Sequence, residues 1–154
     1  MPTRSMPYPN YNYLVDLKSP GIKPDQPLGG FSDVAGLKTE LHIAEYRDGN
    51  DAVPHVHKVP GMHTVGDVTL KRGVVNSSDY WNWVTDVRTN GYSKHRDVTI
   101  TLRDEANNAV EIYKLYNALP KGYTGPTLSG KGSGDLAIEE LVLAVEGIEV
   151  SQPN

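Results

Sequence analysis

Residues 98–116 show the pattern that most limits how this chain of 154 residues can fold. Val98, Ile100 and Leu102 alternate with polar residues, and a turn-forming segment follows at 104–108. Alternation then resumes from 110 to 116, where both faces carry apolar residues. This pattern predicts a β-hairpin. A second strand that is apolar on both sides is typical of one that meets the core on one face and a partner on the other.

The remaining sequence is punctuated by 15 Gly and 11 Pro, which favours a β protein with many turns. Gly36 marks an expected bulge, and Gly147 an expected interruption of the last strand. We predict further strand regions at 11–18, 31–46, 65–75 and 136–150, and connections at 19–30, 47–63 and 118–135.

The expected fold is mainly β: a small antiparallel β-barrel or sandwich of six to seven strands with one packed α-helix. This domain spans 11–151. Three prolines in the first nine residues predict an extended N-terminal arm over 1–10.

One helix is predicted, with Ser77 or Ser78 as N-cap and Asn90-Gly91 as its end. Apolar residues recur at i, i+3, i+4 and i+7, which gives a single stripe for packing against a sheet. Trp81 projects away from that stripe. The expected helix-packing residues are Tyr80, Trp83, Val84 and Val87.

Composition excludes several classes of function. The chain has no cysteine, so disulfides, thiolate zinc sites and cysteine nucleophiles are ruled out. A net charge of −4 argues against nucleic-acid binding through a basic surface. No apolar run is long enough for a membrane-spanning helix or resembles a secretion signal. We therefore expect a chain that is made and folded in the cytoplasm, without stable membrane insertion.

No set of residues predicts an active site, and we expect neither enzymatic activity nor a cofactor. His55 and His57 would point the same way on a strand, so with His63 they could bind zinc or copper, but no carboxylate is placed to orient the imidazoles. Solvated loop histidines are the favoured interpretation. Glu139 and Glu140 are adjacent, face opposite ways on a strand, and are interpreted as solvated charges.

Nine Tyr, two Trp and one Phe would leave apolar patches on a monomer. An oligomer would cover them, and so would a two-layer sandwich. A different class of function stays open at this point: a monomeric β-sandwich binding module, for example for carbohydrate, with Trp81 and exposed tyrosines as stacking platforms.

An ordered series of segments over about residues 8–150 resembles the tail-tube protein family of contractile phage tails and extracellular contractile injection systems. The segments are 31–37, 45–49, 58–61, 68–74, 81–83, 138–141 and 146–147.

The resemblance implies a tail-tube type fold whose subunits form hexameric rings, joined edge to edge around a channel and stacked into a rigid tube. Its implied partners are further copies of the chain, a sheath protein, baseplate and tip proteins, and lumenal protein cargo. Such a tube is driven through a target envelope by sheath contraction. The particle would be assembled in the bacterial cytoplasm and released, or form a virion tail. A baseplate-proximal adaptor ring of the same particle is the alternative role.

The resemblance also assigns a stacking loop to the segment from Glu45 to Met62. Its polar residues would form inter-ring hydrogen bonds and ion pairs, and its apolar residues would pack on the neighbouring ring. The expected inter-ring residues are Arg47, Asp48, Asn50, Asp51, Val59, Pro60 and Met62.

Overall fold

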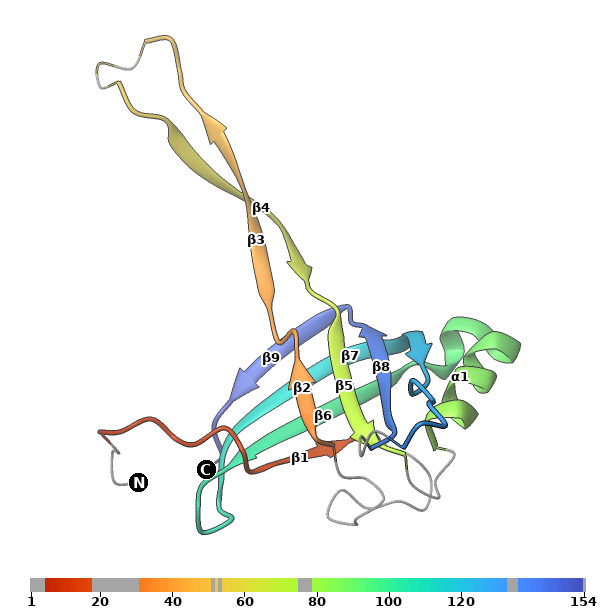
Figure 1. Ribbon diagram of the computed structural model, residues 1–154. Coiled ribbons are helices and arrows are strands. Elements are labelled where there is room, and N and C mark those ends of the chain that lie inside the picture. Colours follow the sequence, from red (N-terminus) through yellow and green to blue (C-terminus); the bar gives the residue numbers. More distant parts are fainter. Residues whose placement is uncertain are drawn as a thin grey trace.

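The computed structural model describes residues 5–17, 31–50, 52, 54–74, 79–132 and 136–153, with the backbone alone at 79 and 80. Within them the chain forms nine strands, one α-helix and one 3₁₀-helix (Figure 1). The elements are β1 (Tyr13–Asp16), β2 (Asp33–Ala35), β3 (Thr39–Tyr46), β4 (His57–Val65), β5 (Val68–Gly73), α1 (Asp79–Asn90), η2 (Gly91–Lys94), β6 (Arg96–Arg103), β7 (Ala109–Thr124), β8 (Ile138–Ala144) and β9 (Gly147–Ser151). The prediction of a mainly β fold with one helix is confirmed.

Seven strands form one antiparallel network that folds into two layers. The first layer has the order β1-β6-β7-β9, and the second has the order β2-β5-β8-β7. The layers share β7 and make an open sandwich. β3 and β4 form a separate two-stranded sheet.

β7 passes from one layer to the other at Asn117, which has a φ of 54°. The backbone N–H of Asn117 donates to Asp97 Oδ1 at 3.1 Å, and its side-chain amide donates to Glu146 Oε2 at 2.9 Å. The expected connection at 118–135 is therefore wrong for 118–124, where the strand continues. Because Asn tolerates positive φ, the residue that suggests a turn serves here as a bulge within a strand.

The core lies between the layers and under α1. Alternate residues of β5 and β8 are buried on one side, and alternate residues of β6 with the middle of β7 are buried on the other, as period-two strands require. The buried apolar residues are Val15, Leu17, Val68, Leu70, Trp83, Val84, Val98, Ile100, Leu115, Ala118, Leu141 and Leu143.

The two clearest local predictions are confirmed. β6 and β7 form the expected hairpin, and Asp104 Oδ1 closes its turn by accepting from the backbone N–H groups of Ala106 and Asn108, both at 2.9 Å. α1 ends at Asn90, before Gly91 at a φ of 71°. The expected N-caps at 77 and 78 lie outside the described residues. None of the described helices is long and apolar enough to span a bilayer.

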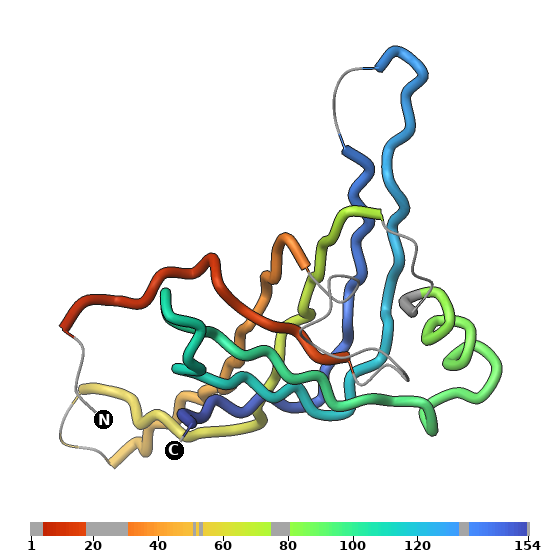
Figure 2. The backbone as a smooth tube through the Cα atoms, turned by 90° about the horizontal axis from the view of Figure 1, so that it is seen from below, coloured from red at the N-terminus to blue at the C-terminus, as the bar shows by residue number. Residues whose placement is uncertain are grey.

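The expected connection at 47–63 is wrong for its second half. Residues 57–63 belong to β4, which pairs with β3 in a long hairpin that projects from the sandwich (Figures 1 and 2). The sequence does not predict this strand for two reasons. It contains Pro60 and Gly61, and it has no buried face that would impose an alternation of apolar and polar residues.

Candidate functional site

The β3–β4 hairpin is the most exposed pair of strands in the described chain. All eight residues of β3 are exposed, and so is every residue of β4 except Val65. The strands pair from Thr39 opposite Val65 to Tyr46 opposite His57, with a register shift between Leu41 and Ile43. The two strands of the hairpin are thus paired with each other over their length but covered on neither face.

Apolar side chains are displayed along this hairpin. Leu41 is 39% exposed, Ile43 43%, Val59 46% and Met62 80%. A two-stranded hairpin alone in water is marginally stable at best. The exposed apolar side chains make this hairpin the candidate surface for binding another molecule.

Exposed ion pairs flank these apolar residues. Lys38 Nζ lies 2.6 Å from Glu40 Oε1, and Lys58 pairs with Glu45 across the two strands. Near the tip, Asp48 Oδ1 accepts a hydrogen bond from the backbone N–H of Asn50 at 3.3 Å. The hairpin therefore offers apolar contacts and charges of both signs to a partner.

The base of the hairpin approaches the sandwich at Gly36. Its φ is +89°, and a Cβ at this position would lie 2.1 Å from the backbone oxygen of Asp67. Only glycine satisfies both conditions without displacement. At Gly36, where an irregularity was expected, the segment that leads into β3 passes close to the segment that leads into β5.

The expected inter-ring residues divide between the tip and β4. Arg47, Asp48 and Asn50 lie in the tip that follows β3, and all three are exposed. Asp51 lies outside the described residues. Val59, Pro60 and Met62 are exposed residues of β4. The structure thus places six of the seven on one projecting element, and their contacts with another ring remain a prediction.

The expected helix-packing residues lie as follows. Trp83 and Val84 are buried in the core, and Val87 packs against it. The side chain of Tyr80 lies outside the description. Trp83 Nε1 donates to the backbone oxygen of Lys94 at 3.0 Å, and the Arg96 guanidinium lies 4.8 Å from the Trp83 ring centroid.

The histidines lie along the hairpin rather than around one point. The His55 and His57 rings are 6.0 Å apart, whereas His63 lies six residues further along β4, about 20 Å away at the usual rise of a strand. Within the described residues, no three His, Asp or Glu side chains converge to hold a metal ion.

A buried ion pair in the sandwich was missed by the sequence interpretation. Glu139 is 6% exposed and accepts from Arg72 Nε at 2.7 Å, so its interpretation as a solvated charge is wrong. Tyr123 donates to the other carboxylate oxygen at 2.8 Å. This hydrogen bond, followed by burial, raises the pKa of Tyr123 above its ordinary value of 10.0. The sequence did contain a signal for the burial of Glu139. On a strand, Glu139 lies on the same face as the apolar residues Leu141 and Leu143.

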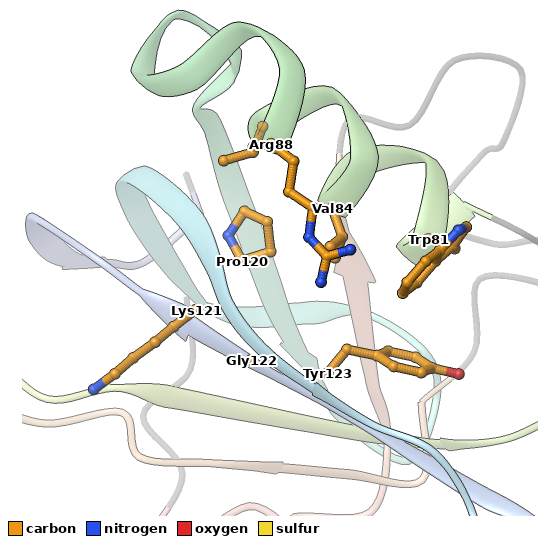
Figure 3. A pocket seen from close by; sticks show the side chains of 8 residues that line it. Trp81, Val84, Arg88, Pro120, Lys121, Gly122 and Tyr123 are labelled. Atoms are coloured by element: carbon orange, nitrogen blue, oxygen red, sulfur yellow. The ribbon is translucent and has the colours of Figure 1, made fainter.

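An open groove of about 350 Å³ lies between α1 and β7 (Figure 3). Trp81 and Tyr123 form one wall in an edge-to-face pair with ring centroids 5.8 Å apart. The Arg88 guanidinium lies 5.2 Å from the Trp81 ring centroid. We call this feature, lined by Trp81, Val84, Val87, Arg88, Pro120, Lys121, Gly122 and Tyr123, the α1–β7 groove.

The sequence matches the family described as "T4-like virus tail tube protein gp19" over residues 9–149. No curated protein matches it.

Three solved structures are similar in fold over nearly the whole chain. A chain of the anti-feeding prophage tube-terminating cap is 22% identical, with a TM-score of 0.81 and coverage of 99% of this chain and 96% of that one. A chain of the sheath–tube complex of PVC, an extracellular contractile injection system, is 24% identical, with a TM-score of 0.80 and coverage of 97% and 94%. A chain of the anti-feeding prophage baseplate is 23% identical, with a TM-score of 0.81 and coverage of 97% and 98%.

Proposed function

Because the chain belongs to the T4-like virus tail tube protein gp19 family, we propose that it is a structural inner-tube subunit of a contractile phage-tail-like injection system, without enzymatic activity. The observation that carries the proposal is the β3–β4 hairpin, an ordered but uncovered element that a monomer would have no means of stabilising. Similar folds in a sheath–tube complex, a tube cap and a baseplate support the same role.

Ring formation is supported by the two outer strands of the first layer. Within the described residues, β1 pairs with β6 alone and β9 with β7 alone, so each has one edge without a strand partner. Open edges of this kind are sites for pairing with another chain. In a hexameric ring, β1 of one subunit would meet β9 of the next and the first layers would join into one barrel around a channel.

Ring stacking is assigned to the hairpin. Its tip residues Arg47 and Asp48 would form polar contacts with the adjacent ring, and Val59 and Met62 would bury their exposed apolar surface there. Repetition of these contacts along the tube would give a rigid assembly without disulfides, which a chain without cysteine requires.

The mechanism is mechanical. A contracting sheath would drive the tube through a target envelope, and protein cargo would travel in its channel. The sheath, baseplate and tip proteins are the remaining proposed partners. The particle would be assembled in the bacterial cytoplasm and act outside the producing cell.

Electron microscopy of the purified full-length chain tests the proposal. We expect hexameric rings or tubes with a central channel. A compact monomer at every concentration would overturn the proposal and favour the β-sandwich binding module.

Deletion of residues 48–57 separates the two levels of assembly. We expect this variant to give rings or monomers without long tubes, because the stacking element is shortened while the β1 and β9 edges are retained. Tubes of normal length would exclude the hairpin from ring stacking.

The number of copies per particle distinguishes the main tube subunit from an adaptor ring. A tube subunit is present in many rings, whereas a baseplate-proximal adaptor or a terminal cap is present in one. Quantitative mass spectrometry of intact particles measures this ratio against the sheath protein.

A further inference from the structure

The two strands of the β3–β4 hairpin have unlike outer edges. Within the described residues, β3 pairs with β4 alone and β4 with β3 alone, so each strand has one edge without a strand partner. The edge of β4 is interrupted at Pro60, which has no N–H. It is also bulged, because β4 has one residue more than β3 where the register shifts between Leu41 and Ile43. With Lys58, β4 therefore combines three features that keep a further strand from pairing with an edge.

The outer edge of β3 has none of these features. Its eight residues include no proline, glycine or lysine, and all of them are exposed. A long, uninterrupted and uncovered edge is the kind of edge to which another strand adds. The hairpin therefore has one edge that accepts a strand and one edge that resists it.

The N-terminal arm has the main-chain pattern of a strand that ends a sheet. Residues 5–11 belong to no strand of the subunit, and all of them except Pro9 are exposed. Met6 and Tyr8 each precede a proline, which favours an extended backbone at both positions. In a strand, their N–H and C=O groups would point to one side, and Pro7 and Pro9 would leave the other side without two N–H groups. The extended arm can therefore pair with a strand on its first side, and it resists further pairing on its second side.

The arm leaves the sandwich at the end away from the hairpin. Its root is fixed at Asn12, whose backbone oxygen accepts from the Arg103 N–H at 2.8 Å and whose Nδ2 donates to the Asp104 backbone oxygen at 2.9 Å. The arm therefore starts beside the β6–β7 turn. In Figure 1 this turn and the arm lie at the lower end of the sandwich, whereas the hairpin rises from the upper end. Figure 2, seen from below, shows the arm and the hairpin extending toward the same side of the sandwich.

Head-to-tail stacking along this direction brings the arm and the hairpin of different copies together. Under the proposed function, the hairpin reaches the adjacent ring, and it approaches that ring from the end where the arms leave. A contact between different surfaces at opposite ends of a subunit repeats without closing, as a tube requires. Residues 5–11 span about 23 Å when extended, and β3 is about 26 Å long. The arm is thus long enough to lie along most of β3.

The other open edges of the described chain do not fit the edge of β3. β1 and β9 pair with each other in the proposed ring, and β2 has only three residues. β4 of another copy has the interrupted edge. The arm, which belongs to no strand, has the length that β2 lacks.

We propose that the arm of one copy adds as a strand to the outer edge of β3 in a copy of the adjacent ring. The side of the arm that carries the N–H groups of Met6 and Tyr8 pairs with β3. The side that carries Pro7 and Pro9 faces outward and ends the sheet. The inference rests on the proposed function, because it requires copies of the chain to stack.

Disulfide formation tests the contact, because the chain has no cysteine of its own. In full-length protein, Met6→Cys on the arm is combined in turn with a second cysteine at each position from 39 to 46 of β3, so that every register is sampled. Neighbouring strands lie about 4.8 Å apart, within the Cα separation of roughly 7 Å that a disulfide allows. Oxidation of assembled protein should therefore give a ladder of linked subunits at one or two positions of the scan.

Positions 57–60 of β4 are the matched control. β4 is the second strand from the added arm, about 10 Å away, which is beyond the reach of a disulfide. We expect severalfold fewer linked subunits from cysteines in β4 than from the best position in β3. Equal yields from the two strands would overturn the addition of the arm to β3.

A pair of substitutions at Tyr8 separates main-chain pairing from side-chain packing. Tyr8→Pro removes the N–H from the side of the arm that pairs with β3, whereas Tyr8→Ala removes the ring and keeps the N–H. In the best pair of cysteine positions, the ladder should be lost with Tyr8→Pro and retained with Tyr8→Ala. Equal loss in both variants would overturn the strand addition, because the contact would then depend on the ring.

The outcomes separate the inference from the proposed function. Tubes in which the thiol at position 6 forms no disulfide with β3 of another copy would overturn the strand addition and leave the proposed function intact. A disulfide within one subunit would also overturn it, because the arm would then lie on its own hairpin. Failure of the native chain to stack into tubes would overturn the proposed function, and the strand addition with it.

Discussion

β3–β4 and β5–β8 are both antiparallel strand pairs, yet they differ in what covers them. β5 alternates between buried and half-buried residues, whereas every residue of β3 is exposed. Leu70 of β5 and Ile43 of β3 have similar chemistry, but Leu70 is 0% exposed and Ile43 is 43% exposed. Strand pairing is therefore independent of burial in this fold. β5 is covered by a layer of the same chain. Under the proposed function, β3 is covered by another copy of the chain.

The largest expected effect comes from removing a charge from the β5–β8 pair. Glu139→Ala leaves Arg72 buried opposite no carboxylate, which should lower the free energy of unfolding by about 3–5 kcal/mol. Urea denaturation of unassembled subunits measures it. The matched change in the hairpin is Glu40→Ala, which breaks the ion pair with Lys38. These side chains are 60% and 65% exposed, so the urea midpoint of unfolding should not change. Equal shifts of the urea midpoint in the two variants would show that burial does not determine the contribution of these ion pairs to stability.

Truncation of an apolar side chain compares the same two strand pairs without changing a charge. Leu70→Ala should cost about 2–5 kcal/mol of unfolding free energy, because the core cannot fill the cavity. Ile43→Ala should change it by less than about 1 kcal/mol in the isolated subunit. Thermal or urea unfolding at low protein concentration provides the measurement. A large loss at Ile43 would mean that the hairpin is stabilised within the subunit.

Two glycines compare the base of the hairpin with its tip. Gly36→Ala forces a Cβ against the Asp67 carbonyl at positive φ, and should cost about 1–3 kcal/mol. Gly49→Ala at the tip meets no atom within 4 Å and should stay within about 0.5 kcal/mol of the native chain. Circular dichroism melts of both variants measure the difference. Similar values would contradict the tight crossing at the base.

The smallest expected effect is a pH dependence that arises in the sandwich. The hydrogen bond to Glu139 and then burial raise the pKa of Tyr123, so the folded chain keeps this proton where the unfolded chain, with a value near 10.0, loses it. The resulting stability is complete below pH 10 and declines as the pH rises through the folded pKa. Tyr123→Phe should therefore flatten the alkaline loss of stability above about pH 10, where the unfolded chain begins to lose this proton. Parallel alkaline slopes for both proteins would refute this role of Tyr123.

Much of the sandwich could be predicted because its residues obey local rules. The β6–β7 hairpin follows from the alternation at 98–102 and the turn-forming segment at 104–108, and α1 ends at Asn90, before Gly91, as its sequence indicates. In both cases burial of one face imposes a period that the sequence displays.

The features that the sequence did not predict are those whose usual sequence pattern is absent, or whose residues normally indicate a different structure. β4 has no buried face to impose alternation, and it contains Pro60 and Gly61. β7 continues through Asn117, because a bulge there uses the residues that normally make a turn. Glu139 and Arg72 lie on the inner face of neighbouring strands, so their pairing depends on a cross-strand register that the sequence does not state.

The continuity of β7 across Asn117 also has a mechanical consequence. The two layers are joined there by peptide bonds, and Asp97 and Glu146 hold the corner from either side. A pull that separates the layers must therefore stretch a covalent chain or shear two ladders of hydrogen bonds at once, instead of peeling one sheet from the other. In the proposed tube, this corner would hold the two layers of each subunit together when force is applied to it.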